Sequence, residues 1–380
     1  MEKTIQQKVG VNFNFPVIFT RGIFRTENNL LRDTLKGIEE KKRHRLMVIL
    51  DEGAGGPERI RNYVEHHRGE LDWAGEALVY QAGEALKNDV DTVLKMVDAL
   101  AAAKLCRHSF VVAIGGGALL DVAGLAVSLV HRGLRLVRIP TTVLSQCDSG
   151  VGVKNGINYA GQKNLLGSFS PPFAVINDFD FLSTLPQDAW IAGLAEAFKV
   201  AIIKDARFFE FLCESAKSLA DRNEALMEET IIRCAELHLE HMRDGGDPYE
   251  CGTARPLDFG HWAAHELERM TRWKLGHGQA VALGLVLDSL YACRKGWLGE
   301  AELLRIQQGL KDCGFIIKHS SMLERDVQEN LLLLRGLESF REHLGGQLSI
   351  TFPKGIGQHM EAHEIDTHLM EQCLVEIDSA

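Results

Sequence analysis

One glutamate and three histidines, spread over three stretches of the chain, are of the residue types that bind a divalent metal. Glu196 and Lys199 lie three residues apart in a strongly apolar segment, and His261 and His265 lie four apart, so each pair shares one face of a helix. His277 lies in a loop that leads into another apolar segment. A catalytic zinc ion takes about three protein ligands and keeps one position open. These residues therefore suit a metal site built from separate helices, although a surface ion pair and ordinary core histidines would produce the same pattern.

A long polar segment, residues 141–167, carries the second group of chemically useful side chains. Lys154 and Lys163 stand nine residues apart in it, among glycines that let the backbone approach a ligand closely. A loop of this length is usually functional or disordered, and its interleaved valines and leucines argue against disorder. We expect a cradle for a phosphorylated, polyhydroxylated small molecule. The alternative is a structural hairpin whose lysines are solvated.

A run of glycines supplies the third candidate site. The predicted strand 110–114 continues into the glycines 115–117, and a predicted helix begins near Ala118. The free N–H groups and the positive dipole end of a helix N-terminus bind pyrophosphate. The spacing is not that of G-x-G-x-x-G, so a plain tight turn is the alternative. Asp51 ends an earlier predicted strand, where an acidic residue often accepts a hydrogen bond from a ribose hydroxyl.

The composition narrows the class of protein. The chain has 380 residues, is 46% apolar and has a formal charge of −10, which argues against a nucleic-acid-binding protein. Its eight cysteines are scattered without any Cys-x-x-Cys, which favours reduced thiols and a cytoplasmic location. The N-terminus lacks the apolar core of a signal peptide, and no apolar run reaches the length of about 18 residues that a membrane helix needs. We therefore expect no membrane association.

The hydrophobic periodicity divides the chain into two parts. Alternating strands and helices over residues 40–140 predict a parallel, doubly wound sheet. Helical periodicity dominates from about residue 188, and we place a domain boundary near residues 180–187. The expected domains are residues 1–183 and 184–380. The predicted strands are 5–20, 46–50, 77–80, 110–114, 134–139, 173–177 and 347–352, and the predicted helices are 29–40, 57–67, one ending near 103, one starting near 118, 188–203, 206–220, 222–242, 259–272, 278–295, 298–312, 322–335 and 360–375.

The three groups together suggest one kind of chemistry. A dinucleotide site in the α/β half, a metal site in the helical half and a lysine-rich segment between them suit alcohol oxidation. The metal would polarise a hydroxyl, and a nicotinamide ring would take the hydride. Several cations beside such a site indicate an alcohol that also carries phosphate, often with a carboxylate.

Eight ordered motifs make the chain resemble the dehydroquinate synthase superfamily, the sugar phosphate cyclases, over about residues 45–355. The motifs are GGGALLDVAG, HRG, IPTT, QCDSGVGVKNGIN, GQKNLLGSF, GLAEAFK, LDFGHWAAH and LGHGQAVALG. The resemblance implies a Rossmann-like N-terminal domain with NAD and a mostly α-helical C-terminal domain with a metal, Zn²⁺ or Co²⁺. It also implies a small sugar phosphate as substrate and a homodimer.

The resemblance further implies roles for individual residues. The metal ligands would be Glu196, His261 and His277. The NAD site would be lined by Asp51, Glu84, Lys87, Gly116, Gly117, Asp121, Thr141, Thr142, Thr184 and Leu185, with Lys154 and Lys163 at its border. The substrate would face Arg132, Asp148, Lys154, Lys163, Asn164, Lys199, Asp258 and His265.

The reaction that the resemblance implies is redox-neutral overall. NAD⁺ oxidises one ring hydroxyl to a ketone, which acidifies the neighbouring C–H, and phosphate leaves by β-elimination. The hydride then returns, the ring opens and an intramolecular aldol reaction closes a carbocycle. The cations would bind the phosphate, and the metal would hold the hydroxyls that become carbonyl and enolate.

The chain departs from the family pattern where the substrate carboxylate and phosphate would be held. Asp258 replaces the usual Asn, and GHWAAH replaces GHTFGH. The usual lysine and Glu-Gly-x-Arg are absent, and the nearest substitutes are His238 or His241 and a displaced Arg255, with Arg341 and His343 nearer the C-terminus. Dehydroquinate synthase is the first expectation, and a sedoheptulose 7-phosphate cyclase of the valiolone-synthase type is the alternative. A metal-dependent polyol dehydrogenase and a catalytically idle binding protein are less favoured.

Overall fold

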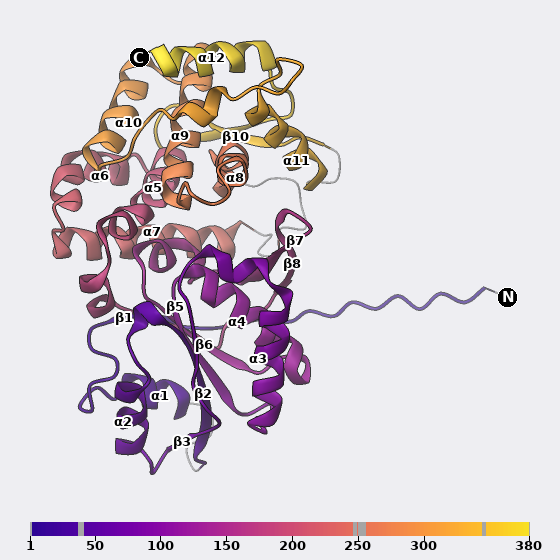
Figure 1. The fold of residues 1–380 in the computed structure, drawn as a ribbon, viewed down its shortest axis with the longest axis vertical. Helices are drawn as coiled ribbons and strands as arrows, with labels where there is room; N and C mark the ends of the chain where they lie inside the picture. The colour runs from indigo at the N-terminus through magenta and orange to yellow at the C-terminus, as the bar shows by residue number, and fades with distance from the viewer. Residues whose placement is uncertain (1, 37–41, 246–248, 250–255, 344–346, 380) are drawn as a thin grey trace.

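The computed structural model describes residues 2–36, 42–245, 249, 256–343 and 347–379. It has a parallel sheet with flanking helices at one end and a group of helices at the other (Figure 1). This arrangement confirms the predicted fold class, an α/β N-terminal part followed by a mostly helical C-terminal part. In the described part, no helix combines the length and the apolar character needed to cross a membrane.

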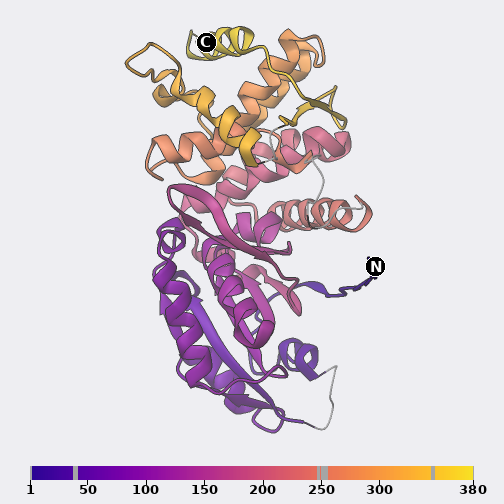
Figure 2. The same cartoon turned by 90° about the vertical axis from the view of Figure 1, so that its right-hand side faces the viewer.

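The sheet has seven strands that pair in parallel in the order β1-β9-β6-β5-β2-β3, with β4 also paired to β2. Side chains of β2 alternate between two apolar clusters, one shared with α1 and α2 and the other with α3 and α4. Helices therefore cover both faces of the sheet (Figure 2). The elements are β1 (Val17–Thr20), β2 (His44–Asp51), β3 (Leu71–Trp73), β4 (Leu78–Tyr80), β5 (Phe110–Gly115), β6 (Arg135–Pro140), β9 (Ala174–Asp178), α1 (Leu30–Lys36), α2 (Glu58–His66), α3 (Val90–Ala102) and α4 (Gly117–Leu129).

The prediction of strand structure from residue 5 onward is wrong before Val17. Residues 5–15 alternate polar and apolar side chains, but they pair with no described strand, and Ile5, Val9 and Val11 are exposed. Alternation alone does not make a strand, because each strand needs a hydrogen-bonding neighbour. The short strand β3 was not predicted.

A hairpin rises from the sheet toward the helical part (Figure 1). Its strands β7 (Lys154–Tyr159) and β8 (Gln162–Phe169) pair antiparallel, and a short π-helix, η4 (Ser145–Ser149), precedes them. The segment 141–167 is thus neither a loop throughout nor disordered. It is a hairpin, as the structural alternative proposed. Lys154 is exposed, as that alternative also proposed, whereas Lys163 is largely buried, with its side chain 14% exposed.

Two helices of the helical part, α5 and α9, are buried on nearly every side. Both lack a polar face, so they form the core of this part. The helices and the small sheet are α5 (Gln187–Lys204), α6 (Ala206–Ala220), α7 (Glu224–Asp244), α8 (His261–Met270), α9 (His277–Arg294), α10 (Glu300–Asp312), α11 (Arg335–His343), α12 (Thr367–Ser379), β10 (Ile350–Pro353) and β11 (His359–Ala362).

Two predicted helices near the C-terminus are wrong in part. In place of a helix over 322–335, two short 3₁₀ helices flank a turn in which Asp326 accepts hydrogen bonds from the N–H groups of Gln328 and Asn330. Such local side-chain bonds compete with helix formation. The predicted helix 360–375 begins only at Thr367, because His359–Ala362 form a strand that pairs with β10.

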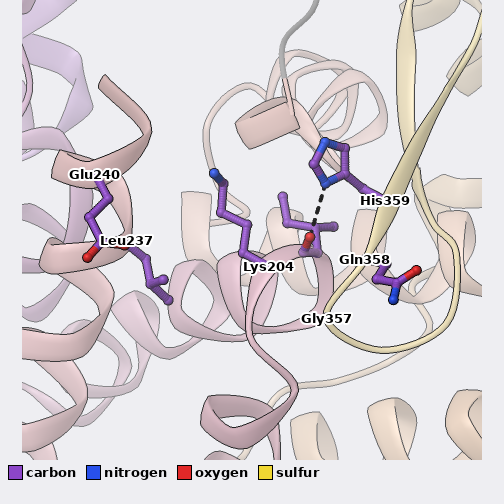
Figure 3. Close-up of a pocket in the computed structure, with 7 residues that line it drawn as sticks. Lys204, Leu237, Glu240, Gly357, Gln358 and His359 are labelled. Atoms are coloured by element: carbon purple, nitrogen blue, oxygen red, sulfur yellow. Dashed lines mark hydrogen bonds between the residues drawn. The ribbon is translucent and has the colours of Figure 1, made fainter. Parts of the chain in front are cut away.

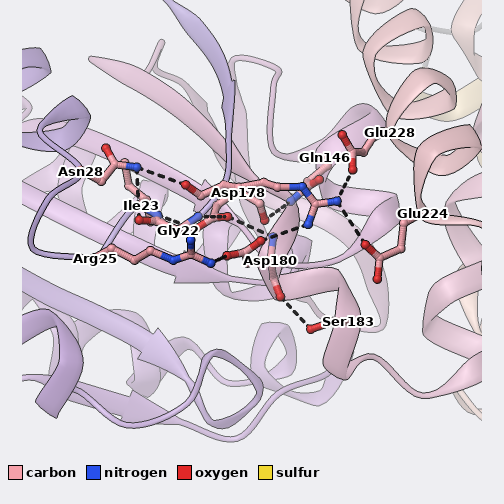
Figure 4. A network of polar contacts seen from close by, with 11 residues as sticks. Gly22, Ile23, Arg25, Asn28, Gln146, Asp178, Asp180, Ser183, Glu224 and Glu228 are labelled. Atoms are coloured by element: carbon pink, nitrogen blue, oxygen red, sulfur yellow. Dashed lines mark hydrogen bonds and ion pairs between the residues drawn. The ribbon is translucent and has the colours of Figure 1, made fainter.

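A polar network joins the sheet to the helical part (Figure 4). Arg21, just after β1, forms ion pairs with Asp180 and with Glu224 and Glu228 of α7. Nearby, the side-chain amide of Gln146 in η4 donates to the carbonyls of Pro140 and Asp178, at 3.0 and 3.1 Å. These bonds fix the π-helix between the ends of two sheet strands.

Candidate active site

Three candidate metal ligands from three helices converge in the helical part. Glu196 of α5 is fully buried, and its Oε1 lies 3.4 Å from Nε2 of His261 and 3.3 Å from Nε2 of His277. The ligand atoms of the three residues all lie within 4.8 Å of one another. Both carboxylate oxygens of Glu196 are buried without a hydrogen-bond donor of acceptable geometry. A buried carboxylate that faces two imidazole nitrogens in this way fits a divalent cation.

Both histidines are oriented by their second ring nitrogen. Nδ1 of His261 lies 3.1 Å from the carbonyl oxygen of Phe259, and Nδ1 of His277 lies 3.3 Å from Oε2 of Glu268. When Nδ1–H donates to these oxygens, Nε2 keeps its lone pair for a metal. Sequence reasoning missed Glu268, although it follows His261 by seven residues and His265 by three and therefore lies on the same helix face.

A carboxylate of α9 fixes the start of α8, where His261 stands. Asp288 is fully buried and accepts hydrogen bonds from the N–H of Gly260 at 3.0 Å and from Nε1–H of Trp262 at 2.9 Å. Burial raises the pKa of Asp288 to about 7, although the two hydrogen bonds act to lower it. No described cation pairs with it.

A chain of alternating charges continues from Glu196. Nζ of Lys199 lies 2.5 Å from Oε2 of Glu196 and 3.7 Å from Oδ2 of Asp148, whose Oδ1 is 3.4 Å from Nε2 of His238. Burial would lower the pKa of Lys199, but Glu196 and Asp148 raise it above its ordinary value. Burial likewise opposes the charge on His238, but Asp148 raises its pKa to about 9. All four groups therefore favour their charged forms.

Asp148, Glu196 and His238 form a second set of closely spaced ligand atoms. The ammonium of Lys199 already lies between the two carboxylates of that set. A divalent cation there would meet this positive charge, so the set of Glu196, His261 and His277 is the better metal site.

The hairpin brings Lys163 to the metal ligands. Its Nζ lies 2.7 Å from Oε2 of Glu268 and 3.4 Å from Nδ1 of His277. His265 is stacked on His277, with ring centroids 6.3 Å apart. Burial, and then the charge of Lys163, hold the pKa of His265 well below its usual range. The side chain of residue 265 is thus a neutral imidazole beside the site.

Asn164, next to Lys163, reaches the sheet part. Its Oδ1 accepts from Nζ of Lys87 at 2.5 Å, and the same ammonium donates to Oδ2 of Asp121 at 2.6 Å. Asn158 of the same hairpin bonds Glu84, with Nδ2 and Oε1 3.4 Å apart. These contacts bring together three of the predicted cofactor residues, Glu84, Lys87 and Asp121, under the hairpin.

The glycine turn lies at the carboxyl edge of the sheet. Asp51 accepts from the N–H of Gly116 at 2.8 Å and from that of Ala54 at 3.0 Å, and it is only 3% exposed. A side chain at position 117 would meet Oγ of Ser149 at 2.5 Å, so that hydroxyl would have to move. Asp51 therefore shapes the backbone that presents the N-terminus of α4, besides any contact with a ribose.

Threonines complete this edge. The N–H of Thr141 donates to the carbonyl of Gly115 at 3.0 Å, and the hydroxyl of Thr142 lies 2.8 Å from that of Ser145. Thr184 and Leu185 end the 3₁₀ helix η5 (Phe179–Thr184), which follows β9. Parallel strands end at one edge, so these residues share that edge with the glycine turn.

Other predicted residues lie at different distances from this cluster. Asp258 is close enough to Lys199 for its charge to raise the pKa of that lysine, and the charge of Lys154 helps to lower the pKa of Asp148. Arg132 is exposed and lies beyond the far end of α4 from Gly117, at roughly 20 Å for a helix of this length. One chain thus does not bring Arg132 to the cluster.

The expected substitutes for the missing carboxylate-binding residues are scattered. His238 joins the charged chain, whereas Nδ1 of His241 contacts Nζ of Lys204 at 3.2 Å and Arg341 pairs with Glu338. Residue 255 and the side chain of residue 343 lie outside the described part.

A cleft of about 500 Å³ opens beside Lys204, the lysine that contacts His241 (Figure 3 shows the lining residues). Its lining comes from the end of α5, from α7 and from the turn before β11, and Nδ1 of His359 lies 3.1 Å from the carbonyl oxygen of Ile203. It was not predicted from the sequence. The lining residues are Ile203, Lys204, Leu237, Glu240, Gly357, Gln358 and His359.

Comparison with known proteins covers most of the chain. Residues 77–192 match the family model for the 3-dehydroquinate synthase N-terminal region, and residues 193–334 match that for the C-terminal region. The 3-dehydroquinate synthase of Alkaliphilus metalliredigens (strain QYMF) is 33% identical over 75% of this chain and 78% of its own length. A 2-epi-5-epi-valiolone synthase of Streptomyces albus is 33% identical over 90% of this chain and 83% of its own length.

A solved structure with the same fold is similar along almost its whole length. It is a 2-epi-5-epi-valiolone synthase from Streptomyces hygroscopicus subsp. jinggangensis 5008 with NAD⁺ and Zn²⁺ bound. The two structures align with a TM-score of 0.88 and 27% sequence identity, over 99% of both chains.

Proposed function

Because this chain belongs to the 3-dehydroquinate synthase family, we propose that it is a sugar phosphate cyclase, a carbon–oxygen lyase that acts on a seven-carbon sugar phosphate. The reaction would eliminate phosphate and close a carbocycle by an intramolecular aldol step. The observation that carries this proposal is the convergence of Glu196, His261 and His277 beside Lys199. A simple polyol dehydrogenase would have no need for the further cations at 154 and 163.

Glu196, His261 and His277 would hold the metal, zinc or cobalt. Such an ion supplies Lewis acidity to the oxygens of a bound polyol. The fit of the site rests on the buried Oε1 of Glu196, which accepts no hydrogen bond from a described residue, and on the two imidazoles whose Nδ1 atoms already face an oxygen. The similar Streptomyces structure contains Zn²⁺.

The glycine turn and the carboxyl edge of the sheet would hold NAD. The dinucleotide supplies reversible hydride transfer when bound. Gly116 and Gly117 leave room for its pyrophosphate at the N-terminus of α4, and Asp51 holds that turn in shape. Glu84, Lys87, Asp121, Thr141, Thr142, Thr184 and Leu185 would line the remainder of the site.

Side chains around the metal ligands would bind and orient the sugar phosphate. Lys154, Lys163 and Asn164 would contact phosphate oxygens, and Lys199 would keep a proton at a substrate oxygen, which its raised pKa favours. Asp148, Asp258 and His265 would position hydroxyls. Arg132 would also face the substrate, although in one chain it lies beyond the far end of α4 from Gly117.

A valiolone-type cyclase is the second candidate. The Streptomyces albus relative covers 90% of this chain, against 75% for the Alkaliphilus 3-dehydroquinate synthase, and the similar solved structure is a 2-epi-5-epi-valiolone synthase. Such an enzyme would use sedoheptulose 7-phosphate, which has no carboxylate. The departures at Asp258 and around residue 255 agree with a substrate that lacks one.

Phosphate release separates the candidates. The protein would be incubated with NAD⁺ and Zn²⁺ and with seven-carbon sugar phosphates that do or do not carry a carboxylate, while absorbance at 340 nm is followed. We expect phosphate release without net NADH. Net NADH without phosphate would identify a polyol dehydrogenase, and the absence of both with every substrate would reject the proposal.

We also propose a homodimer in the cytoplasm, with the division into domains near residues 183 and 184. Leu165, Leu166 and Phe169 of the hairpin are exposed, as are Val11 and Phe13, which supports burial against a second copy. All cysteines in the described part are free, which agrees with a reducing compartment. Molar mass in solution tests the dimer.

A further inference from the structure

One fully buried arginine, Arg138 of β6, has no role in the site described so far. Its side chain is 0% exposed, and no described carboxylate forms an ion pair with it. Burial lowers the pKa of its guanidinium to about 10. A buried charge without an ion-pair partner is costly unless hydrogen bonds satisfy it, so the hydrogen bonds of this guanidinium are what make its burial possible.

The guanidinium bonds to a single irregular segment, residues 150–155. One terminal nitrogen donates to the carbonyls of Gly150 and Gly152 at 3.3 and 2.7 Å. The other donates to the carbonyl of Lys154 at 3.0 Å and to Oδ1 of Asn155 at 2.6 Å. One planar group thus binds the carbonyls of Gly150 and Gly152, which lie outside the strands, and the first two residues of β7, Lys154 and Asn155.

Asn155 extends the contact into the hairpin. Its Nδ2 lies 3.3 Å from the carbonyl oxygens of both Ser168 and Ser170. A side chain at position 150 would meet Pro140 and the carbonyl oxygen of Ser145 at 2.5 Å, so the segment turns closely over the end of β6. Arg138 therefore holds both the start of the hairpin and its last residues.

The held segment joins two residues of the proposed site. Asp148 precedes it in η4, and Lys154 is its last residue but one. A displacement of the carbonyl of Lys154 also displaces its ammonium, and a shift of about 1 Å in a positioned group can cost a hundredfold in rate.

We propose that Arg138 is a positioning residue that sets the place of Lys154 relative to Asp148 and Lys199 and so determines how well the phosphate of the substrate is bound. The inference rests on the proposed cyclase function. Lysine cannot replace the guanidinium, because it is a point charge without a planar fork of donors. An apolar residue would fill the volume but leave the carbonyls unpaired.

Kinetics of Arg138→Lys test the proposal, with Arg135→Lys on the same strand as the matched control. Arg135 stacks on Phe110 and Phe173, away from the hairpin. We expect KM for the sugar phosphate to rise about tenfold in Arg138→Lys, with NAD affinity and zinc content little changed and the melting temperature lowered, and no such rise in KM in Arg135→Lys. In the double variant with Lys154→Ala, the two effects should not multiply, because both act through one ammonium.

Two results would overturn the proposal: a KM within twofold of the wild type, or fully multiplicative effects in the double variant. If Arg138→Lys does not fold, Asn155→Ala, which removes the acceptor at 2.6 Å, should raise KM in the same way. Amide exchange gives a readout without substrate. The amide hydrogens of residues 150–155 should exchange at least tenfold faster in Arg138→Lys than in the wild type, while those of β5 exchange at the same rate. Equal rates for residues 150–155 would refute the positioning role of Arg138, even if the wild type released no phosphate.

Discussion

The glycine turn and the metal cluster organise their polar groups in opposite ways. At the turn, backbone N–H groups of Gly116 and Ala54 converge on one carboxylate, Asp51. In the cluster, charged side chains pair with one another across large sequence distances; Lys163 and Glu268, for example, are 105 residues apart. The turn therefore depends on the pairing of β2 with β5, which brings Asp51 to the backbone of Gly116, 65 residues away, whereas the cluster depends on the packing of the hairpin against α8 and α9.

The two regions also differ in charge. Each buried lysine near the cluster has a carboxylate within 3 Å: Glu196 for Lys199, Glu268 for Lys163 and Asp121 for Lys87. Removal of one partner from such a pair leaves the other charge buried and uncompensated. Substitutions in the cluster should therefore have larger effects than substitutions at the turn.

The largest effect is expected for Glu196→Gln. This change removes a proposed metal ligand and leaves Lys199 without its nearest carboxylate, so we expect loss of bound zinc and a fall in kcat/KM of about a thousandfold or more. Metal analysis after dialysis and phosphate release are the measurements. Full zinc occupancy in the variant would contradict the ligand assignment and remove the main contrast between the regions.

Glu268→Gln should have the next largest effect. Glu268 contacts Nδ1 of His277 and forms an ion pair with Lys163. Burial alone would raise the pKa of Glu268, but the charges of His277 and Lys163 lower it below its ordinary value. Loss of such a carboxylate behind a ligand histidine typically costs 10–100-fold in metal affinity. Competition with a zinc chelator measures this.

The matched control for Glu268 is Glu266→Gln on the same helix. Glu266 is also buried, but it pairs with Arg269 rather than with a ligand. We expect its metal affinity to stay within about twofold of the wild type. Equal losses in the two variants would mean that Glu268 acts only through the stability of α8.

Sequence reasoning identified the parts that are contiguous. The strand, glycines and helix at 110–129 follow one another directly, and the helix boundaries of α5, α6 and α9 were predicted within about two residues. Glu196, His261 and His277 were also predicted as a group, and the structure brings them together. Their role as ligands stays a prediction.

The missed features depend on distant neighbours. The pairing of His238 with Asp148, the contacts of Glu268 and the four bonds of Arg138 follow from how α7, α8 and β6 pack, which local periodicity does not encode. The error in the predicted helix 322–335 has a local cause instead: Asp326 accepts hydrogen bonds from the backbone N–H groups two and four residues ahead. Exposure of Arg132 could not be foreseen from its motif.

A smaller effect is expected at the glycine turn for Asp51→Asn. An amide keeps one acceptor oxygen, so only one of the bonds to Gly116 and Ala54 is lost, and we expect NAD affinity to fall three- to tenfold with zinc content unchanged. Fluorescence titration with NADH measures it. A loss of zinc together with NAD affinity would show that the two regions are not independent.

The smallest effect is expected for Asp288→Asn, and it is a change in how the free energy of unfolding depends on pH. Asp288 is the buried carboxylate near the cluster that has no cation among the described residues. Burial raises the pKa of Asp288 to about 7, against the bonds from Trp262 and Gly260. A raised pKa means that the folded state favours the protonated acid. This contribution to stability is complete below the ordinary pKa of 3.8 and is lost as the pH rises through about 7.

The asparagine variant stays neutral throughout, so its stability relative to the wild type should improve between pH 5 and 8, by at most about 1.4 kcal/mol for each pH unit. Urea unfolding at several pH values measures the difference, and Asp188→Asn, an exposed acid of α5, serves as the control with a constant offset. A constant offset for Asp288→Asn as well would mean that the carboxyl group is already ionised at pH 5. Its two hydrogen bonds would then outweigh burial, and the cluster would not need a cation for every buried carboxylate.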